Sequence, residues 1–217
     1  MARLPAAQQD FLMYETKAKA NGFRFVFGVD EAGRGPLAGP VVAGAVLLKD
    51  THFENLIADS KLLSPRQRDR AFLEIQERAW FGIGIMNEKV IDEINILRAA
   101  HLAMTAAVHD LVQHLPVDIS GVEDFRRSVK VLIDGNLFTG RLPYSIETIV
   151  GGDGKSLSIA CASIIAKVTR DRIIEQYDQI YPQYGFKAHK GYPTLVHREA
   201  IRKFGLSPIH RKTFRVS

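Results

Sequence analysis

The chain has 217 residues, of which 29 are Lys or Arg and 24 are Asp or Glu, giving a net charge of +5 at pH 7. With 46% hydrophobic and 24% charged residues, its composition is that of a folded globular protein and excludes intrinsic disorder. The single cysteine, Cys161, excludes an internal disulfide, disfavours a cysteine-built zinc site and is typical of a reducing compartment.

Predicted helices and strands alternate along the chain. Apolar runs predict strands, and Ser64 followed by Pro65 and Gln67 is a capping box that begins a helix. In chain order the elements are a helix over 5–21, strands over 25–29 and 41–48, a helix from 65, a strand over 80–86, a helix over 95–113, strands over 129–133 and 145–150, and helices over 158–177 and 194–204. Residues 116–128 are predicted to form a surface loop. This alternation predicts an α/β fold, with a sheet covered by helices.

No segment predicts a membrane span or a secretion signal. The most apolar run, residues 37–48, is broken by Pro40 and two glycines and is far shorter than the roughly 20 residues of a spanning helix. Gln8, Gln9 and Asp10 interrupt the N-terminus before an apolar signal core could form. We therefore expect a cytoplasmic protein with no membrane partner.

The positive charge is concentrated at the C-terminal end. Residues 186–217 contain eight basic side chains and one acidic side chain, Glu199, whereas the rest of the chain is slightly acidic. A basic segment on a faintly acidic body favours a polyanionic partner such as nucleic acid. A solvated C-terminal helix that only improves solubility explains the same charges equally well.

Four carboxylates follow apolar strands: Asp30 with Glu31, then Asp134, then Asp153. Ligands of open α/β sheets bind beyond the carboxyl ends of the strands, so these side chains are expected to converge. Crowded carboxylates repel one another, and a divalent cation would relieve that repulsion. Oxygen ligands favour Mg²⁺ or Mn²⁺, and such ions assist phosphodiester hydrolysis.

Each of these carboxylates also has a purely structural explanation. Asp134 and Asp153 each precede a glycine, and Asp-Gly is a common turn dipeptide. Asp30 and Glu31 could simply be a hydrated strand end. Four separate turns explain the joint placement less well than one metal-dependent site does.

The loop after Glu31 contains Gly33, Arg34 and Gly35. Two glycines let the backbone approach a ligand closely, and successive backbone N–H groups can hold an anion or a hydroxyl. The triplet alone is weak evidence and would also fit a plain connection. Its position beside a carboxylate pair favours a loop that faces a substrate.

Long motifs in this chain resemble those of bacterial ribonuclease HII. They are residues 28–41 (GVDEAGRGPLAGPV), 59–61 (DSK), 134–136 (DGN), 152–153 (GD), 158–171 (SIACASIIAKVTRD) and 189–194 (HKGYPT). The resemblance covers roughly residues 25–214. It implies a ribonuclease H-like α/β fold, in which helices flank a mixed central sheet and a small helical appendage follows. Together with the change in charge near residue 186, it predicts a catalytic domain over 25–185 and a basic appendage over 186–217, preceded by an N-terminal helical extension over 1–24 that lies beyond the family core.

The resemblance also implies an activity and the residues that perform it. The family cuts the RNA strand of RNA–DNA hybrids and nicks duplex DNA on the 5′ side of a single ribonucleotide, leaving 3′-hydroxyl and 5′-phosphate ends. The four carboxylates carry over as catalytic residues and ligands of Mg²⁺ or Mn²⁺. Gly33, Arg34 and Gly35 carry over as the loop that senses the 2′-hydroxyl, and Tyr192 as the residue that senses the junction. Lys61 is expected near a substrate phosphate, and the protein is expected to act as a monomer on nucleic acid.

Some features differ from the family pattern or fit another interpretation. Leu62 stands where lysine is frequent, and Cys161 stands where alanine is usual, which we interpret as buried packing. Tyr192 could instead be a surface turn residue before Pro193. The sister enzyme ribonuclease HIII is a second hypothesis, but its loop lacks Arg34 and its substrate-binding domain would not fit in the 29 residues before Asp30. A non-catalytic nucleic-acid-binding module is a third, and it would not need four intact carboxylates.

Overall fold

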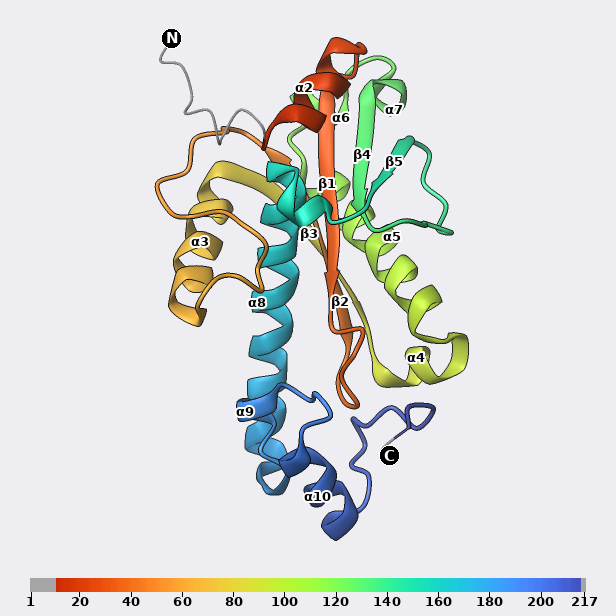
Figure 1. Ribbon diagram of the computed structural model, residues 1–217. Coiled ribbons are helices and arrows are strands. Elements are labelled where there is room, and N and C mark those ends of the chain that lie inside the picture. Colours follow the sequence, from red (N-terminus) through yellow and green to blue (C-terminus); the bar gives the residue numbers. More distant parts are fainter. Residues whose placement is uncertain (1–10, 216–217) are drawn as a thin grey trace.

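The computed structural model describes residues 11–215, which form a mixed five-stranded sheet covered by helices (Figure 1). The strands lie in the order β3 (Ala79–Met86), β2 (Val41–Leu48), β1 (Phe25–Ala32), β4 (Val129–Asp134) and β5 (Ser145–Ile149). Strands β1, β2 and β3 pair antiparallel, whereas β4 and β5 run parallel to β1. The expected α/β class and mixed sheet are therefore confirmed.

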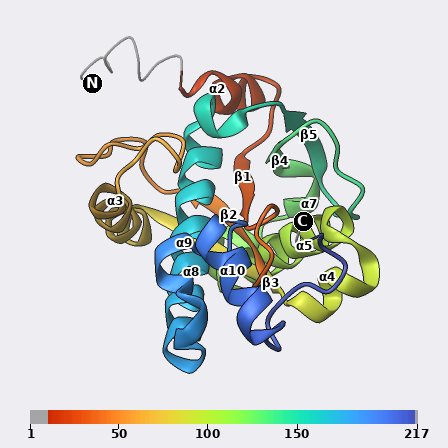
Figure 2. The ribbon, with the colours of Figure 1, turned by 60° about the horizontal axis from the view of Figure 1, so that its bottom comes forward.

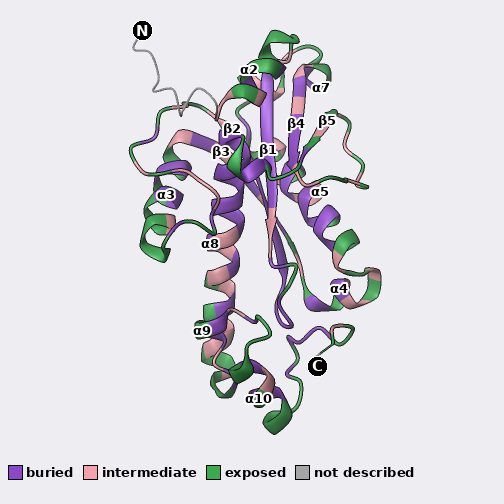
Figure 3. Cartoon of the chain, in the orientation of Figure 1, coloured by how far each residue is buried: buried purple, intermediate pink, exposed green. Residues whose placement is uncertain are grey.

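Two long helices cover opposite faces of the sheet, α8 (Leu157–Ile180) on one and α5 (Ile96–His114) on the other (Figure 1). Glycines in the strands let both helices approach closely. A Cβ at Gly28 of β1 would overlap the backbone of α8 at Ser158, and a Cβ at Gly84 of β3 would overlap the carbonyl of Ala103 in α5. Strands β1 and β2 are buried along most of their length (Figure 3), so they read as continuous apolar runs, whereas the edge strands β3 and β5 are partly exposed.

The capping box predicted from the sequence is present, and a second side-chain cap begins α5. Ser64 and Gln67 form the reciprocal capping box of α3 (Pro65–Arg78), and the Asn95 side chain accepts from two backbone N–H groups of α5. The remaining helices are α2 (Met13–Ala20), α4 (Glu88–Ile94), α6 (Val117–Ser120), α7 (Phe125–Ser128), α9 (Phe186–His189) and α10 (Leu195–Phe204), with short 3₁₀ turns η1 (Gly152–Gly154) and η2 (Pro182–Tyr184).

Several predicted boundaries were wrong. Strand β1 continues to Ala32, because pairing with β2 carries it past Asp30 and Glu31. The predicted loop over 116–128 contains α6 and α7, and Phe125 of α7 packs against Phe25 with ring centroids 5.5 Å apart. The helix predicted over 5–21 is α2, which begins at Met13, and residues 1–10 lie outside the described part of the chain.

The single cysteine lies in the core. Cys161 is fully buried on α8 in the cluster that α8, α3 and β2 form, and burial raises the pKa of its thiol well above the usual value. A thiol that resists ionisation and is sealed from solvent is not a nucleophile. The interpretation of Cys161 as packing is therefore confirmed.

The C-terminal segment, residues 186–215, packs against the body and has no separate core. Its apolar cluster includes Phe186 and Ile201, but also Ile174 of α8 and Leu37 of the loop between β1 and β2. Figure 2 shows α9 and α10 beside that loop. The domain boundary at residue 186 stays a prediction. Within residues 11–215, no helix is long and apolar enough to cross a membrane.

Candidate active site

Parallel pairing of β1 and β4 places two carboxylates side by side. Val29 is the register partner of Ile133, so Asp30 and Asp134 are the next residues along neighbouring strands. Val29 and Ile133 both face the core under α5, and side chains alternate along a strand. Asp30 and Asp134 therefore both face α8.

The other two predicted carboxylates come from the adjoining segments, and each has a basic partner. Asp153 lies in η1, the turn that leads from β5 into α8, and its Oδ2 is 3.3 Å from Nζ of Lys61. Glu31 follows Asp30, and its Oε1 accepts from Nη1 of Arg34 at 3.1 Å. Lys61 therefore lies beside Asp153, and its expected contact with a substrate phosphate stays a prediction.

Burial and mutual repulsion disfavour the ionised carboxylates. Burial, followed by repulsion from Glu31 and Asp134, raises the pKa of Asp30 well above its usual value. Burial is also the main cause of the raised pKa values of Glu31 and Asp153, and the charge of Asp134 contributes to both. Asp134 thus acts electrostatically on all three of the others, which makes it the centre of the cluster.

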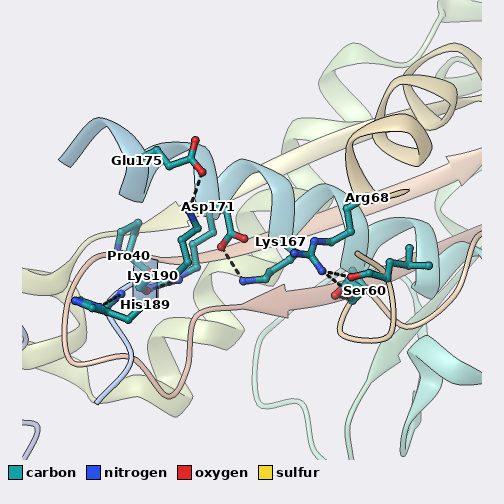
Figure 4. A network of polar contacts seen from close by, with 12 residues as sticks. Pro40, Ser60, Arg68, Lys167, Asp171, Glu175, His189 and Lys190 are labelled. Carbon is teal, nitrogen blue, oxygen red and sulfur yellow. Dashed lines mark hydrogen bonds and ion pairs between the residues drawn. The ribbon is translucent and has the colours of Figure 1, made fainter. Parts of the chain in front are cut away.

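Hydrogen bonds connect this cluster to α8 and to the loop that carries Lys61. A hydrogen bond from the Ser163 side chain opposes the rise in the pKa of Asp30, and the Ser163 hydroxyl lies 2.9 Å from the Ser60 hydroxyl. The Ser60 carbonyl accepts from Nη1 of Arg68 at 2.8 Å (Figure 4). The side chain of Arg68 therefore fixes the loop next to Asp30.

The chemistry of the donor set fits a hard divalent cation. The cluster offers only carboxylate oxygens, which are the ligands that Mg²⁺ and Mn²⁺ prefer. Within residues 11–215, however, no three acidic, His or Cys side chains are close enough together to form a closed metal cage. Three of the carboxylates have separate local partners instead. Asp134 accepts from the Gly152 N–H at 2.7 Å. Asp153 pairs with Lys61, and Glu31 pairs with Arg34. Cation binding would therefore draw these side chains together.

The predicted substrate-facing loop adjoins the carboxylates. Gly33 has a φ of +103°, and a Cβ there would overlap the side chain of Arg170, so the position requires glycine. A Cβ at Gly35 would lie 3.6 Å from Cε1 of Tyr192. Tyr192 is 42% exposed and is thus available to a ligand. The structure thus places Tyr192 next to the loop of Gly33, Arg34 and Gly35, and their roles toward a substrate stay predictions.

A chain of neutral histidines holds the backbone of Tyr192. The Ser207 N–H donates to Nδ1 of His210, so the proton of this neutral ring is on Nε2 and is donated to Nε2 of His197 at 3.0 Å. Nδ1–H of His197 then donates to the Tyr192 carbonyl at 2.9 Å. Burial lowers the pKa of His197 and, with repulsion from His197, lowers that of His210 to about 4. Both rings therefore stay neutral at pH 7, as this arrangement requires.

Sequence reasoning missed several residues that shape the site. Ser163 and Arg170 lie in the motif over 158–171, which was interpreted only as a helix. Arg211 was counted among the basic side chains expected at a polyanion, but it is fully buried. Burial of an arginine has no local sequence signature, so only the structure could separate Arg211 from its exposed neighbour Lys212.

Comparisons with known proteins agree on one family. The ribonuclease HII family model matches residues 27–217. A ribonuclease HII of Ruminiclostridium cellulolyticum is 50% identical over 207 residues, which cover 95% of this chain and 76% of the relative. A ribonuclease HII of Acholeplasma laidlawii is 45% identical over 214 residues, covering 94% of each chain.

Solved structures show the same fold. Ribonuclease H2 from Pyrococcus horikoshii is 28% identical with a TM-score of 0.63, covering 88% of this chain and 94% of that one. A Bst-RNase HIII structure in complex with Mn²⁺ has a TM-score of 0.69 at 19% identity, covering 92% of this chain and 70% of that one. At that identity, the likeness concerns the fold alone.

The replacement Asp134→Asn tests the electrostatic role of Asp134. The amide oxygen can still accept from Gly152, while repulsion of Asp30, Glu31 and Asp153 falls. A carboxylate whose pKa is higher in the folded than in the unfolded protein binds more protons in the folded state. Without metal, the stability of the native protein therefore decreases as the pH rises from about 4, the pKa in the unfolded chain, through the raised pKa values of the folded state. We expect Asp134→Asn to weaken that decrease and to stabilise the metal-free protein by ~1 kcal/mol at pH 7.

Thermal unfolding with and without Mg²⁺ or Mn²⁺ measures this effect. We expect the cations to raise the Tm of the native protein and to have little effect on Asp134→Asn, because binding to the folded state is lost. A large drop in the metal-free Tm of the variant would contradict this account and favour a structural turn at Asp134.

Proposed function

Because the chain belongs to the ribonuclease HII family, we propose that it nicks duplex DNA on the 5′ side of a single embedded ribonucleotide, leaving 3′-hydroxyl and 5′-phosphate ends. Like its family, it is an endoribonuclease that hydrolyses the RNA strand of RNA–DNA hybrids. The observation that carries the finer proposal is the glycine loop beside the carboxylate cluster, with Tyr192 next to Gly35.

The catalytic ligands in this proposal are Asp30, Glu31, Asp134 and Asp153. They would hold Mg²⁺ or Mn²⁺, and such ions supply an activated water and stabilise the leaving oxygen of a phosphodiester. The charge of Asp134 already acts on the other three carboxylates, which supports a shared site. A structural relative of the same fold was solved with Mn²⁺, which is compatible with either cation.

The remaining site residues orient the substrate. Lys61 is bound to Asp153 and Asp59, with its side chain 75% exposed, so its ammonium can turn toward a phosphate when a cation takes over Asp153. Gly33, Arg34 and Gly35 would contact the 2′-hydroxyl, which is the chemical difference between a ribonucleotide and a deoxyribonucleotide. Tyr192 would place its ring against the sugar or base beside the scissile phosphate.

The two alternative functions have less support. A ribonuclease HIII-type enzyme shares the fold, but the family model and the curated relatives are those of ribonuclease HII. A non-catalytic binding module does not explain why four carboxylates lie near one another, where burial and mutual repulsion raise the pKa values of Asp30 and Asp153. We further propose a monomer that acts in the cytoplasm on nucleic acid, with residues 25–185 as the catalytic domain and 186–217 as the appendage.

A basic groove beside the site supports a polyanionic substrate. It lies between α3, α8 and α9 and contains five basic and three acidic side chains. Lys167 and Lys190 pair with Asp171 and Glu175 in this groove (Figure 4), whereas Lys187 has no carboxylate within ion-pair distance in the described chain. Lys187 is therefore the side chain most available to a phosphate there. The basic residues of the groove are Arg68, Lys167, Arg172, Lys187 and Lys190.

Cleavage of a DNA duplex with one ribonucleotide tests the proposed function and the role of Tyr192. We expect the native protein to nick it with Mg²⁺ or Mn²⁺ and to leave a 3′-hydroxyl on the 5′ side of the ribonucleotide. Tyr192→Ala should keep the fold and cation binding but lose at least about tenfold in kcat/KM on this duplex, because positioning is impaired. Equal kcat/KM values for variant and native protein would show that Tyr192 is a surface turn residue. Absence of the nick with native protein would contradict the function itself.

Point substitutions test the basic surface better than a truncation does, because residues 186–215 also pack on the body. We expect Lys187→Gln to lower the slope of log affinity against log salt concentration for an RNA–DNA hybrid by about one, if one phosphate contact is lost. Arg127→Gln is the control, since this exposed side chain is on α7, at the opposite end of the molecule from α9 (Figure 1). Equal slopes for Lys187→Gln and native protein would mean that Lys187 contacts no phosphate.

A further inference from the structure

Two buried arginines lie beneath the glycine loop. Arg170 and Arg211 are 0% and 1% exposed and are the largest fully buried side chains of the described chain. Neither has a carboxylate within ion-pair distance among residues 11–215. Burial of an unpaired charge is costly, and here burial, with repulsion from Arg170, lowers the pKa of Arg211 to about 9. The groups that these two guanidinium groups bind must therefore stabilise them in the core.

Arg211 donates hydrogen bonds to four carbonyls of one short loop. Nη2 donates to Gly33 at 2.6 Å, Nη1 donates to Arg34 at 3.0 Å and to Pro36 at 2.8 Å, and Nε donates to Gly39 at 2.9 Å. The backbone N–H of Arg211 also donates to the carbonyl of Leu37, so the same residue holds the loop through its main chain. The planar guanidinium, with five donors in a fixed geometry, suits such a set of acceptors, whereas a lysine ammonium does not.

These hydrogen bonds determine where the loop amides point. The described peptide bonds are all trans, and in a trans peptide the C=O of one residue and the N–H of the next point in opposite directions. Because the carbonyls of Gly33 and Arg34 point inward to Arg211, the N–H groups of Arg34 and Gly35 point away from it. Neither N–H donates to an acceptor in the described part of the chain. Two free donors are thus presented side by side, next to Glu31 and Tyr192.

Arg170 fixes the other boundary of the loop. Its Nη2 and Nε donate to the carbonyls of Ala38 and Pro40, and its Nη1 donates to the carbonyl of Lys190, just before the turn that carries Tyr192. The Arg170 guanidinium also lies 6.0 Å from the centre of the Tyr192 ring. The loop and Tyr192 are therefore held by one buried framework.

We propose that Arg211 is a specificity-determining positioning residue, which orients the N–H groups of Arg34 and Gly35 as donors to the 2′-hydroxyl of the substrate ribonucleotide. The proposal rests on the proposed function, because it assumes that this loop reads the hydroxyl. It also reassigns one of the eight basic residues of the C-terminal segment, since Arg211 acts on the loop and contacts no phosphate. Selectivity would then depend on a residue 177 positions away from Arg34.

The test compares affinities for two duplexes of one sequence, one containing a single ribonucleotide and one entirely DNA, without divalent cation so that neither is cut. We expect the native protein to bind the ribonucleotide duplex at least tenfold more tightly. Arg211→Lys keeps the charge but not the planar set of donors, and it should reduce that ratio to below threefold while the affinity for all-DNA duplex stays within twofold of native. With cation present, the same variant should lose kcat on the ribonucleotide duplex more than it changes KM.

Two control variants separate this role from general destabilisation. Arg127→Lys makes the same replacement at an exposed position on α7, and Ile75→Val removes a methyl group from the core beside α3. Both should keep the native affinity ratio, even where Ile75→Val lowers the Tm. A native ratio above tenfold that persists in folded Arg211→Lys would overturn the role of Arg211 alone. If the native protein bound the two duplexes equally well, the loop over 33–35 would not recognise the 2′-hydroxyl. That result would overturn both the proposed role of the loop and the role of Arg211.

A measurement on the native protein keeps the proposal testable if Arg211→Lys does not fold. Amide hydrogen exchange at Arg34 and Gly35 should be fast in the free protein, because these N–H groups have no acceptor in the part of the chain that the structure describes. The ribonucleotide duplex should protect both amides, and the all-DNA duplex should leave them unprotected. Equal protection by the two duplexes would overturn the proposal.

Discussion

Parallel pairing of β1 with β4 is the constraint on which the site depends. The register that joins Val29 to Ile133 places Asp30 and Asp134 next to each other on the face under α8. Gly28 allows the backbone of α8 to approach that face closely, and this approach brings Ser163 to Asp30. Asp30 is thereby buried, and its burial and the nearby charges of Glu31 and Asp134 raise its pKa. The fold thus maintains a repulsion that a divalent cation would relieve.

Around this cluster, each neighbouring segment adds one element of recognition. The turn between β5 and α8 supplies Asp153, the loop before α3 supplies Lys61, and the loop after β1 supplies two N–H groups that have no acceptor among residues 11–215. The C-terminal segment supports the site through hydrogen bonds from Arg211 to the glycine loop and from the histidines to the backbone of Tyr192. The basic appendage therefore supports the active site as well as offering exposed charges to a polyanion.

Much of the fold and most of the candidate site could be predicted from the sequence, because their signals are local. The capping box at Ser64, the cap at Asn95 and the apolar strands are specified by short patterns, and the carboxylates lie near the ends of those strands or just after them. The positions that were missed depend on contacts between distant segments. Strand β1 extends past Asp30 only because β2 pairs with it, and Arg211 is buried only because the loop over 33–39 offers it carbonyls. Contacts between segments so far apart in the sequence produce no local pattern of residues from which they could be predicted.

The site depends on Asp30 and Asp134 forming a repelling pair that a divalent cation would relieve. Carbon-detected NMR titration of the aspartate side chains, with and without saturating Mg²⁺, measures this repulsion. We expect the Asp30 carboxyl to titrate well above its usual pKa in metal-free protein, and Mg²⁺ to shift its titration to lower pH. An ordinary pKa for Asp30 that Mg²⁺ leaves unchanged would show that no such pair exists.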